Sequence, residues 1–155
     1  MKHIIKCQDG EEDYLIRFDK KPRMIDLIKS FSFLNNVKEE NLFLGFCIYS
    51  IHSSGLFRLL KSNDFILTKD IKLECEEGTT IYIDYCYENI EKILKIFNNE
   101  SEKFLDHLFY ADINRTVVEY HDIFCSGNLY ISPHIDKTYI ETFCNNLNCK
   151  YTKDW

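Results

Sequence analysis

The sequence lacks an excess of basic residues, a long hydrophobic run and the common catalytic motifs. Its formal net charge is -6. A protein that binds nucleic acid needs a basic face to neutralise phosphates, so no nucleic-acid partner is expected. The longest apolar-rich run, residues 42–51, covers about half of a membrane span. P-loop, Gly-x-Ser-x-Gly and dinucleotide-binding patterns are absent, so we expect neither an enzyme nor a cofactor.

Paired Cys-x-x-Cys spacing is also absent, although the chain has 7 cysteines. Their number is odd and most lie in apolar runs, so we interpret them as buried thiols of a reducing compartment. Cys144 and Cys149 could combine with His121, Cys125 and His134 into a zinc site, but the irregular spacing favours ordinary core thiols. The N-terminal apolar stretch is too short for a signal peptide, so a cytoplasmic location is predicted.

Hydrophobic residues make up 45% of the chain and aromatic residues 15%, which indicates a folded protein. The 10 tyrosines and 12 phenylalanines exceed what a small core needs. We therefore expect some of them to form an interaction surface, although any single one is better explained as core.

The pattern of residues 1–88 predicts a ubiquitin-like β-grasp domain. Strands are expected at 2–8 and 13–19, joined by a turn at Asp9-Gly10. Apolar residues at helical spacing follow: Met24, Ile28, Phe31 and Leu34. Further strands are expected over 42–51, 55–61 and 79–87. The expected order is two hairpins separated by a helix and followed by a last strand. This order is typical of a fold in which a mixed sheet wraps a single helix.

Residues 89–155 are predicted to form an all-helical second segment. Apolar stripes at helical spacing occur over 88–100, 101–125 and roughly 134–148, and Ser101 is a candidate cap of the middle helix. The expected fold class is therefore α+β, with a β-grasp lobe followed by a small helical segment.

One motif carries a resemblance to a known family. Between the last two predicted helices, and at a Tyr further on, the chain has Asp122, Ile123, Gly127, Leu129, Ile131, Ser132 and Tyr151. Their order and spacing resemble the second lobe of the FERM domain, the band 4.1/ezrin/radixin/moesin module. The resemblance covers the first lobe and the opening helices of the second. The third lobe, which in the family binds phosphoinositides and receptor tails, has no counterpart.

The resemblance implies a non-enzymatic interaction module that links membrane-associated or cytoskeletal partners. The expected partners are proteins of the membrane cortex or cytoskeleton, with acidic phospholipid as a further candidate. The location implied is cytoplasmic and peripheral to the membrane. Two or three amphipathic helices cannot enclose their own apolar stripe. We therefore expect the helical segment to pack on the β-grasp lobe, to self-associate or to need a remainder of the second lobe.

The densest basic cluster is the candidate site for an acidic lipid or partner. It consists of Arg17, Lys20, Lys21 and Arg23. Each basic residue near an anionic membrane contributes about 1 kcal/mol of attraction. A solvated turn before a helix is the simpler explanation, because Asp19 and Asp26 partly cancel the charge.

A second hypothesis is an adaptor of the Skp1/elongin C type in a ubiquitin ligase. Residues 5–12 resemble its opening strand pair, and residues 81–97 resemble its strand-then-helix segment. The strand-rich region predicted over 42–73 has no place in that fold, so this hypothesis ranks second.

Overall fold

The computed structural model describes residues 2–7, 13–35, 41–49, 54–76, 78–97, 105–123 and 127–153. Its strands are β1 (His3–Ile5), β2 (Tyr14–Arg17), β3 (Leu42–Ile48), β4 (Ile71–Leu73), β5 (Thr79–Asp84), β6 (His107–Asp112), β7 (Thr116–His121), β8 (Asn128–Ile131) and β9 (Lys150–Thr152). Its helices are α1 (Met24–Ser30), α2 (Ser54–Ser62), α3 (Tyr87–Ile96) and α4 (Lys137–Leu147), and the short 3-10 turn η1 (Phe31–Leu34) follows α1.

The main sheet has seven strands in the order β5-β3-β6-β7-β8-β2-β9. Every neighbouring pair in it is antiparallel. The β6–β7 hairpin turns at Asp112, whose Oδ1 accepts hydrogen bonds from the backbone N–H groups of Asn114 and Arg115. Strand β2 comes early in the chain but lies between β8 and β9. The N-terminal and C-terminal parts of the chain therefore share one sheet.

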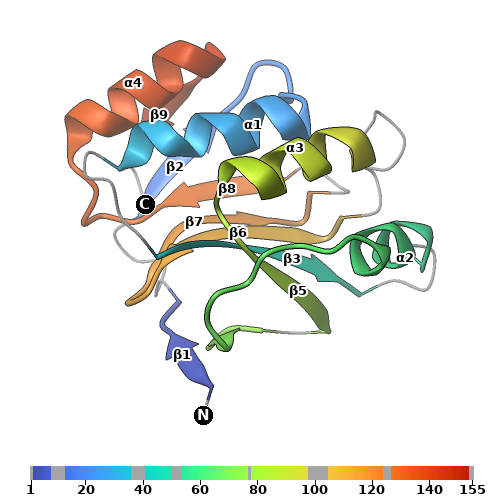
Figure 1. Ribbon diagram of the computed structural model, residues 1–155. Coiled ribbons are helices and arrows are strands. Elements are labelled where there is room, and N and C mark those ends of the chain that lie inside the picture. The colour runs from blue at the N-terminus through green and yellow to red at the C-terminus, as the bar shows by residue number, and fades with distance from the viewer. Residues whose placement is uncertain are drawn as a thin grey trace.

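Helices cover one face of this sheet. Figure 1 shows α4, α1 and α3 side by side above the strands, with α2 beyond α3 at the β5 side. Phe31 stacks between the rings of Tyr110 and Phe143, with centroid distances of 5.0 Å and 6.4 Å. All three rings are fully buried, and burial of one such side chain contributes about 1.5–3 kcal/mol. This aromatic stack joins η1, the sheet and α4 into one core.

The helices predicted from Met24 to Leu34, over 88–100 and over roughly 134–148 are confirmed. In α1, the residues at core spacing are buried, as the stripe from Met24 to Leu34 predicted. In α3, the apolar residues Ile93 and Ile96 are buried. At the start of α4, the Asp136 carboxylate accepts a hydrogen bond from the N–H of Thr138 at 3.0 Å, which satisfies one free donor of the helix.

A second, smaller layer covers part of the opposite face. Strands β1 and β4 form a parallel pair there, and Figure 1 shows β1 on the side of the sheet away from the helices. Ile5, Ile71 and Leu73 of this pair pack against Phe43 and Phe109 of the main sheet. A disulfide between Cys7 and Cys75 joins the ends of the two strands.

The predicted ubiquitin-like β-grasp is wrong. The segments at 2–8 and 13–19 do not pair with each other, because β1 pairs with β4 whereas β2 pairs with β8 and β9. The turn predicted at Asp9-Gly10 lies outside the described residues. The strand predicted over 55–61 is helix α2, which buries Leu56 and Leu60 one helical turn apart.

The predicted all-helical segment is also wrong, because residues 107–121 form the β6–β7 hairpin. Leu108, Phe109, Tyr110 and Ala111 are all buried, since this strand is covered on both faces. A strand covered on both faces has no polar–apolar alternation, and its apolar residues also fit a helical stripe. The cap predicted at Ser101 lies outside the described residues. Strands from both sides of the boundary predicted at 88–89 belong to the main sheet.

The interpretation of the cysteines needs a correction as well. Cys7 and Cys75 form a disulfide, although no local spacing relates them, because β1 and β4 bring their ends together. Cys47 and Cys144 are buried thiols, as predicted, and Cys86 and Cys149 are half-buried thiols. Cys125 lies outside the described residues.

None of the helices that the structure describes is long and apolar enough to span a bilayer.

Removal of the disulfide tests the importance of the second layer. The bond closes a loop with a sequence separation of 68, and for a loop of this length the chain-entropy model gives about 4 kcal/mol of stabilisation. We expect the double variant Cys7→Ser, Cys75→Ser to lose about this much free energy of unfolding in urea. The variant Cys86→Ser is the control. Equal stability of the double variant and the wild type would contradict the disulfide.

Candidate functional site

Four large apolar side chains are exposed on α2, on the segment that follows it and on the first turn of α3. Leu59, Ile66, Leu67 and Tyr87 have exposed fractions between 41% and 76%. They belong to α2, to the segment that follows it and to the first turn of α3, and α2 and α3 pack against each other. We call these four residues the α2–α3 surface. Single exposed apolar residues are common, but a group of them is typical of an interaction site.

The buried side chain of Asn89 fixes the shape of this surface. Its Nδ2 donates to the carbonyl oxygens of Ile66 and Asp84, both at 2.8 Å, and its Oδ1 accepts from the N–H of Ile66 at 2.9 Å. The N–H of Asp84 also donates to the Ile66 carbonyl at 2.9 Å. The amide thus anchors residue 66 to both α3 and the end of β5.

Two further contacts hold the same segment at its ends. The Asn63 Nδ2 donates to the Leu59 carbonyl at 2.7 Å, and the N–H of Thr68 donates to Asp84 Oδ1 at 3.1 Å. Ile66 and Leu67 are therefore displayed from a backbone that is hydrogen-bonded on both sides of them. Such an apolar surface can bind an apolar surface of a partner, and it offers no acid, base or nucleophile of its own.

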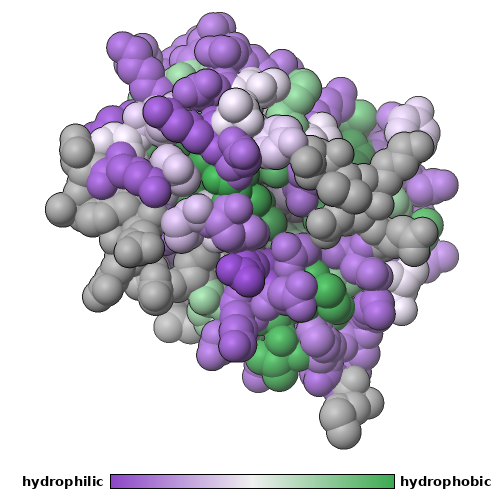
Figure 2. All heavy atoms as spheres, turned by 90° about the vertical axis from the view of Figure 1, so that its left-hand side faces the viewer, coloured by the Kyte–Doolittle hydropathy of each residue, from purple (hydrophilic) through white to green (hydrophobic). Residues whose placement is uncertain are grey.

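The side of the molecule at α4 differs from the α2–α3 surface in its hydropathy. Figure 2 shows this side as mostly hydrophilic, with hydrophobic residues at the centre and at the lower end, where Figure 1 places β1. Ile4 of β1 is 51% exposed.

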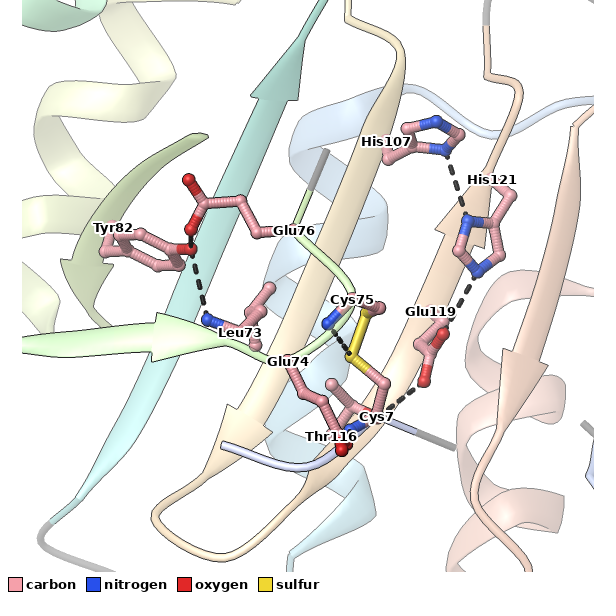
Figure 3. The surroundings of a disulfide bond; sticks show 10 residues. All are labelled: Cys7, Leu73, Glu74, Cys75, Glu76, Tyr82, His107, Thr116, Glu119 and His121. Atoms are coloured by element: carbon pink, nitrogen blue, oxygen red, sulfur yellow. Dashed lines mark hydrogen bonds and ion pairs between the residues drawn. A yellow bond between two sulfur atoms is a disulfide. The ribbon is translucent and has the colours of Figure 1, made fainter. Parts of the chain in front are cut away.

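A chain of polar side chains runs along the second face of the sheet, beside the disulfide (Figure 3). The Thr116 hydroxyl donates to Glu119 Oε2 at 2.6 Å, and Glu119 Oε1 lies 3.1 Å from His121 Nε2. His121 Nδ1 lies 3.2 Å from His107 Nδ1, which also accepts the N–H of Asp122 at 3.2 Å. Glu119 is only 6% exposed, and a glutamate is rarely buried to this degree unless its carboxylate has a partner.

The hydrogen bonds assign the protons of this chain. A backbone N–H always donates, so His107 Nδ1 accepts from Asp122 and the proton between the two rings belongs to His121. The Thr116 hydroxyl is fully buried and offers no accessible nucleophile. Among the described residues, no group of three or more His, Cys, Asp and Glu side chains could hold a metal ion.

A serine, a histidine and an aspartate also meet where β8 leads into α4. Ser132 Oγ hydrogen-bonds His134 Nδ1, and His134 Nε2 lies 4.0 Å from Asp112 Oδ2. Burial is the main cause that lowers the pKa of His134, and the charge of Arg115 adds to it. Ser132 is only 3% exposed, so its hydroxyl is not open to a substrate. The contact fits a structural role in this turn.

The residues of the predicted basic cluster lie on the surface, and two of them line one cavity. Arg17, Lys20, Lys21 and Arg23 are all exposed. Arg17 and Lys21 line a cavity of about 320 Å³ together with Gly127, whereas Lys20 and Arg23 do not line it. The Lys21 ammonium donates to the carbonyl of Ile123. Binding of acidic lipid by these residues stays a prediction.

The residues of the FERM-like motif lie in strands and their connections rather than between two helices. Leu129 and Ile131 of β8 point into the core under the helices, as Ile123 does, and Ser132 is buried. Asp122 has a φ of 53° and accepts the N–H of Gly127, so the two residues close the β7–β8 connection. Tyr151 lies in β9 and donates to Glu141.

Gly127 has a physical reason for its identity that the motif did not supply. Its φ is 68°, and a Cβ at this position would lie 2.8 Å from the ring of Tyr120. A side chain is therefore excluded both by the backbone conformation and by the ring.

Sequence reasoning missed Asn89 and the α2–α3 surface. Asn89 is the polar residue among the buried residues of α3, and this position in a correctly predicted helix was the available signal. Glu119 and His121 are close in the sequence, but they were set aside because they would not face each other on the helix predicted over 101–125. The aromatic surplus predicted an interaction surface in general but did not locate one.

Comparison with known proteins gives no relative. No protein-family model, curated protein or solved structure matches the chain. The FERM resemblance therefore stays a prediction, without the β-grasp lobe that it implied.

Replacement of Asn89 by alanine tests the anchor. The change removes three hydrogen bonds and leaves the buried polar groups around it without these partners. We expect a loss of about 2–4 kcal/mol in the free energy of unfolding, measured in urea. Asn63→Ala, which removes one exposed hydrogen bond, is the matched control and should cost less than about 1 kcal/mol. Similar losses for both variants would show that Asn89 has no special role.

Proposed function

We propose that the chain is a non-enzymatic interaction module that binds a partner protein through the α2–α3 surface. The observation that carries the proposal is the exposure of Leu59, Ile66, Leu67 and Tyr87 on α2, α3 and the segment after α2, which Asn89 ties to α3. Such residues provide a large favourable area once water is removed from them, at about 25 cal/mol per Å².

The rigidity of the surface supports binding. Asn89 and Asp84 hold the backbone at Ile66 in place, so this segment has less freedom to lose when a partner binds. Pre-organisation of this kind raises affinity because ordering a mobile loop costs free energy.

The chain's charge favours another protein over a second copy as the partner. A formal net charge of -6 makes two identical chains repel each other. The self-association expected from the sequence also rested on an all-helical segment, but this segment contributes strands β6, β7, β8 and β9 to the main sheet. We therefore expect a heterologous partner that presents apolar side chains.

The cellular compartment of the partner is a separate part of the proposal. The FERM resemblance points to proteins of the membrane cortex or cytoskeleton. A disulfide such as Cys7–Cys75 is more typical of an oxidising compartment than of the predicted cytoplasm.

Site-specific photo-crosslinking in the native cells tests the binding role. A photo-activatable phenylalanine analogue replaces Tyr87, and the matched control carries it at Asn145, an exposed residue of α4 at the other end of the helical layer. We expect one discrete heterologous product from position 87 and none from position 145. The added changes Leu59→Ser and Ile66→Ser should abolish the product while the free energy of unfolding changes by no more than about 0.5 kcal/mol for each exposed residue.

Two results would contradict the proposal. One is equal crosslinking from both positions, or a product that survives the two serine substitutions. The other is a product that contains two copies of the chain, because it would show that this surface binds a second copy and not a different protein.

A further inference from the structure

The C-terminus of α4 brings two cysteines into contact. Asn148 follows the helix in the left-handed conformation, with φ 54° and ψ 46°. The N–H groups of Asn148 and Cys149 both donate to the carbonyl oxygen of Cys144. The bond from Cys149 is the 6→1 bond of a Schellman cap, and the bond from Asn148 is the 5→1 bond of an αL cap. In a Schellman cap the side chains at the positions of Cys144 and Cys149 pack against each other.

In most proteins this contact is formed by two apolar side chains, whereas here it is formed by two thiols. The Cys144 thiol donates a hydrogen bond to the Cys149 sulfur. Cys144 is only 4% exposed, whereas Cys149 is half-buried and can be reached from solvent. The 3.0 Å hydrogen bond from the Cys149 N–H to the Cys144 carbonyl holds the two residues next to each other.

We propose that Cys144 and Cys149 form a reversible disulfide, which makes the cap of α4 a thiol-oxidation site. Neither the binding role of the α2–α3 surface nor the Cys7–Cys75 bond depends on it. The site takes a small disulfide, such as glutathione disulfide, as its oxidant.

The two cysteines have different roles in the reaction. The Cys149 thiolate attacks one sulfur of glutathione disulfide, forms a mixed disulfide and releases one glutathione thiolate. Cys144 then loses its proton and attacks the Cys149 sulfur, which releases the second glutathione. Two protein thiols are oxidised by two electrons, and one glutathione disulfide is reduced to two glutathione molecules.

The electrostatics of the pair support this order. The hydrogen bond from Cys144 lowers the pKa of Cys149, which favours its thiolate. The same hydrogen bond, followed by burial, raises the pKa of Cys144. The thiolate is the reactive form, so the more accessible cysteine is also the better nucleophile. Cys86 is half-buried as well, but burial raises the pKa of its thiol, which makes it the matched internal control.

Peptide mapping of the native, full-length chain tests the proposal. Trypsin cleaves after Lys137 and Lys150, so one peptide carries both cysteines. The chain is equilibrated with reduced and oxidised glutathione, free thiols are blocked with N-ethylmaleimide, and the peptides are weighed. We expect this peptide to be unalkylated and lighter than its reduced form by two hydrogen atoms. The oxidised fraction should exceed that of Cys86 by about tenfold or more.

Single variants separate the two roles. Cys144→Ser should keep a stable mixed disulfide with glutathione at Cys149, because the resolving thiol is gone. Cys149→Ser should leave Cys144 unmodified, because the buried thiol is out of reach of glutathione. Far-UV circular dichroism of each variant confirms that it is folded. Full alkylation of both cysteines in the wild type, or equal glutathionylation of the two variants, would overturn the proposal.

Discussion

Strands β3 and β6 carry buried apolar side chains on both of their faces, and the rest of the fold follows from this constraint. In β3, Leu44 and Phe46 face the helices, whereas Phe43 and Cys47 face the other way. A sheet with two apolar faces has to be covered twice. Three helices cover the first face, and the β1–β4 pair, tied by the Cys7–Cys75 disulfide, covers part of the second.

The same constraint decides how much of the fold the sequence predicts. Elements with one buried side, namely α1, α3 and α4, have a clear stripe and were predicted. The β6–β7 hairpin is buried on both sides, has no alternation and was assigned to a helix. The position of β2 between β8 and β9, and the contact between β1 and β4, depend on pairings between residues that are far apart in the chain. No local pattern encodes them, and the β-grasp prediction and the missed disulfide both result from this.

The candidate site follows a similar division. The basic residues were visible in the sequence, and the structure leaves all four exposed, with Arg17 and Lys21 lining one cavity. The α2–α3 surface depends on a single buried amide, which joins a helix, a strand end and a connecting segment. Its apolar residues are exposed on α2, on α3 and on the segment after α2, so burial within this chain does not account for them. The proposed binding to a partner would account for them.

The central claim is that the α2–α3 surface is rigid although its side chains face solvent. Amide hydrogen exchange of Ile66 tests it most directly, because this N–H donates to the buried Asn89 side chain. We expect the Ile66 amide to be protected to a similar degree as Ile93 within α3, since the amide can exchange only when the anchor opens. Exchange as fast as that of an exposed loop residue such as Lys69 would contradict the claim.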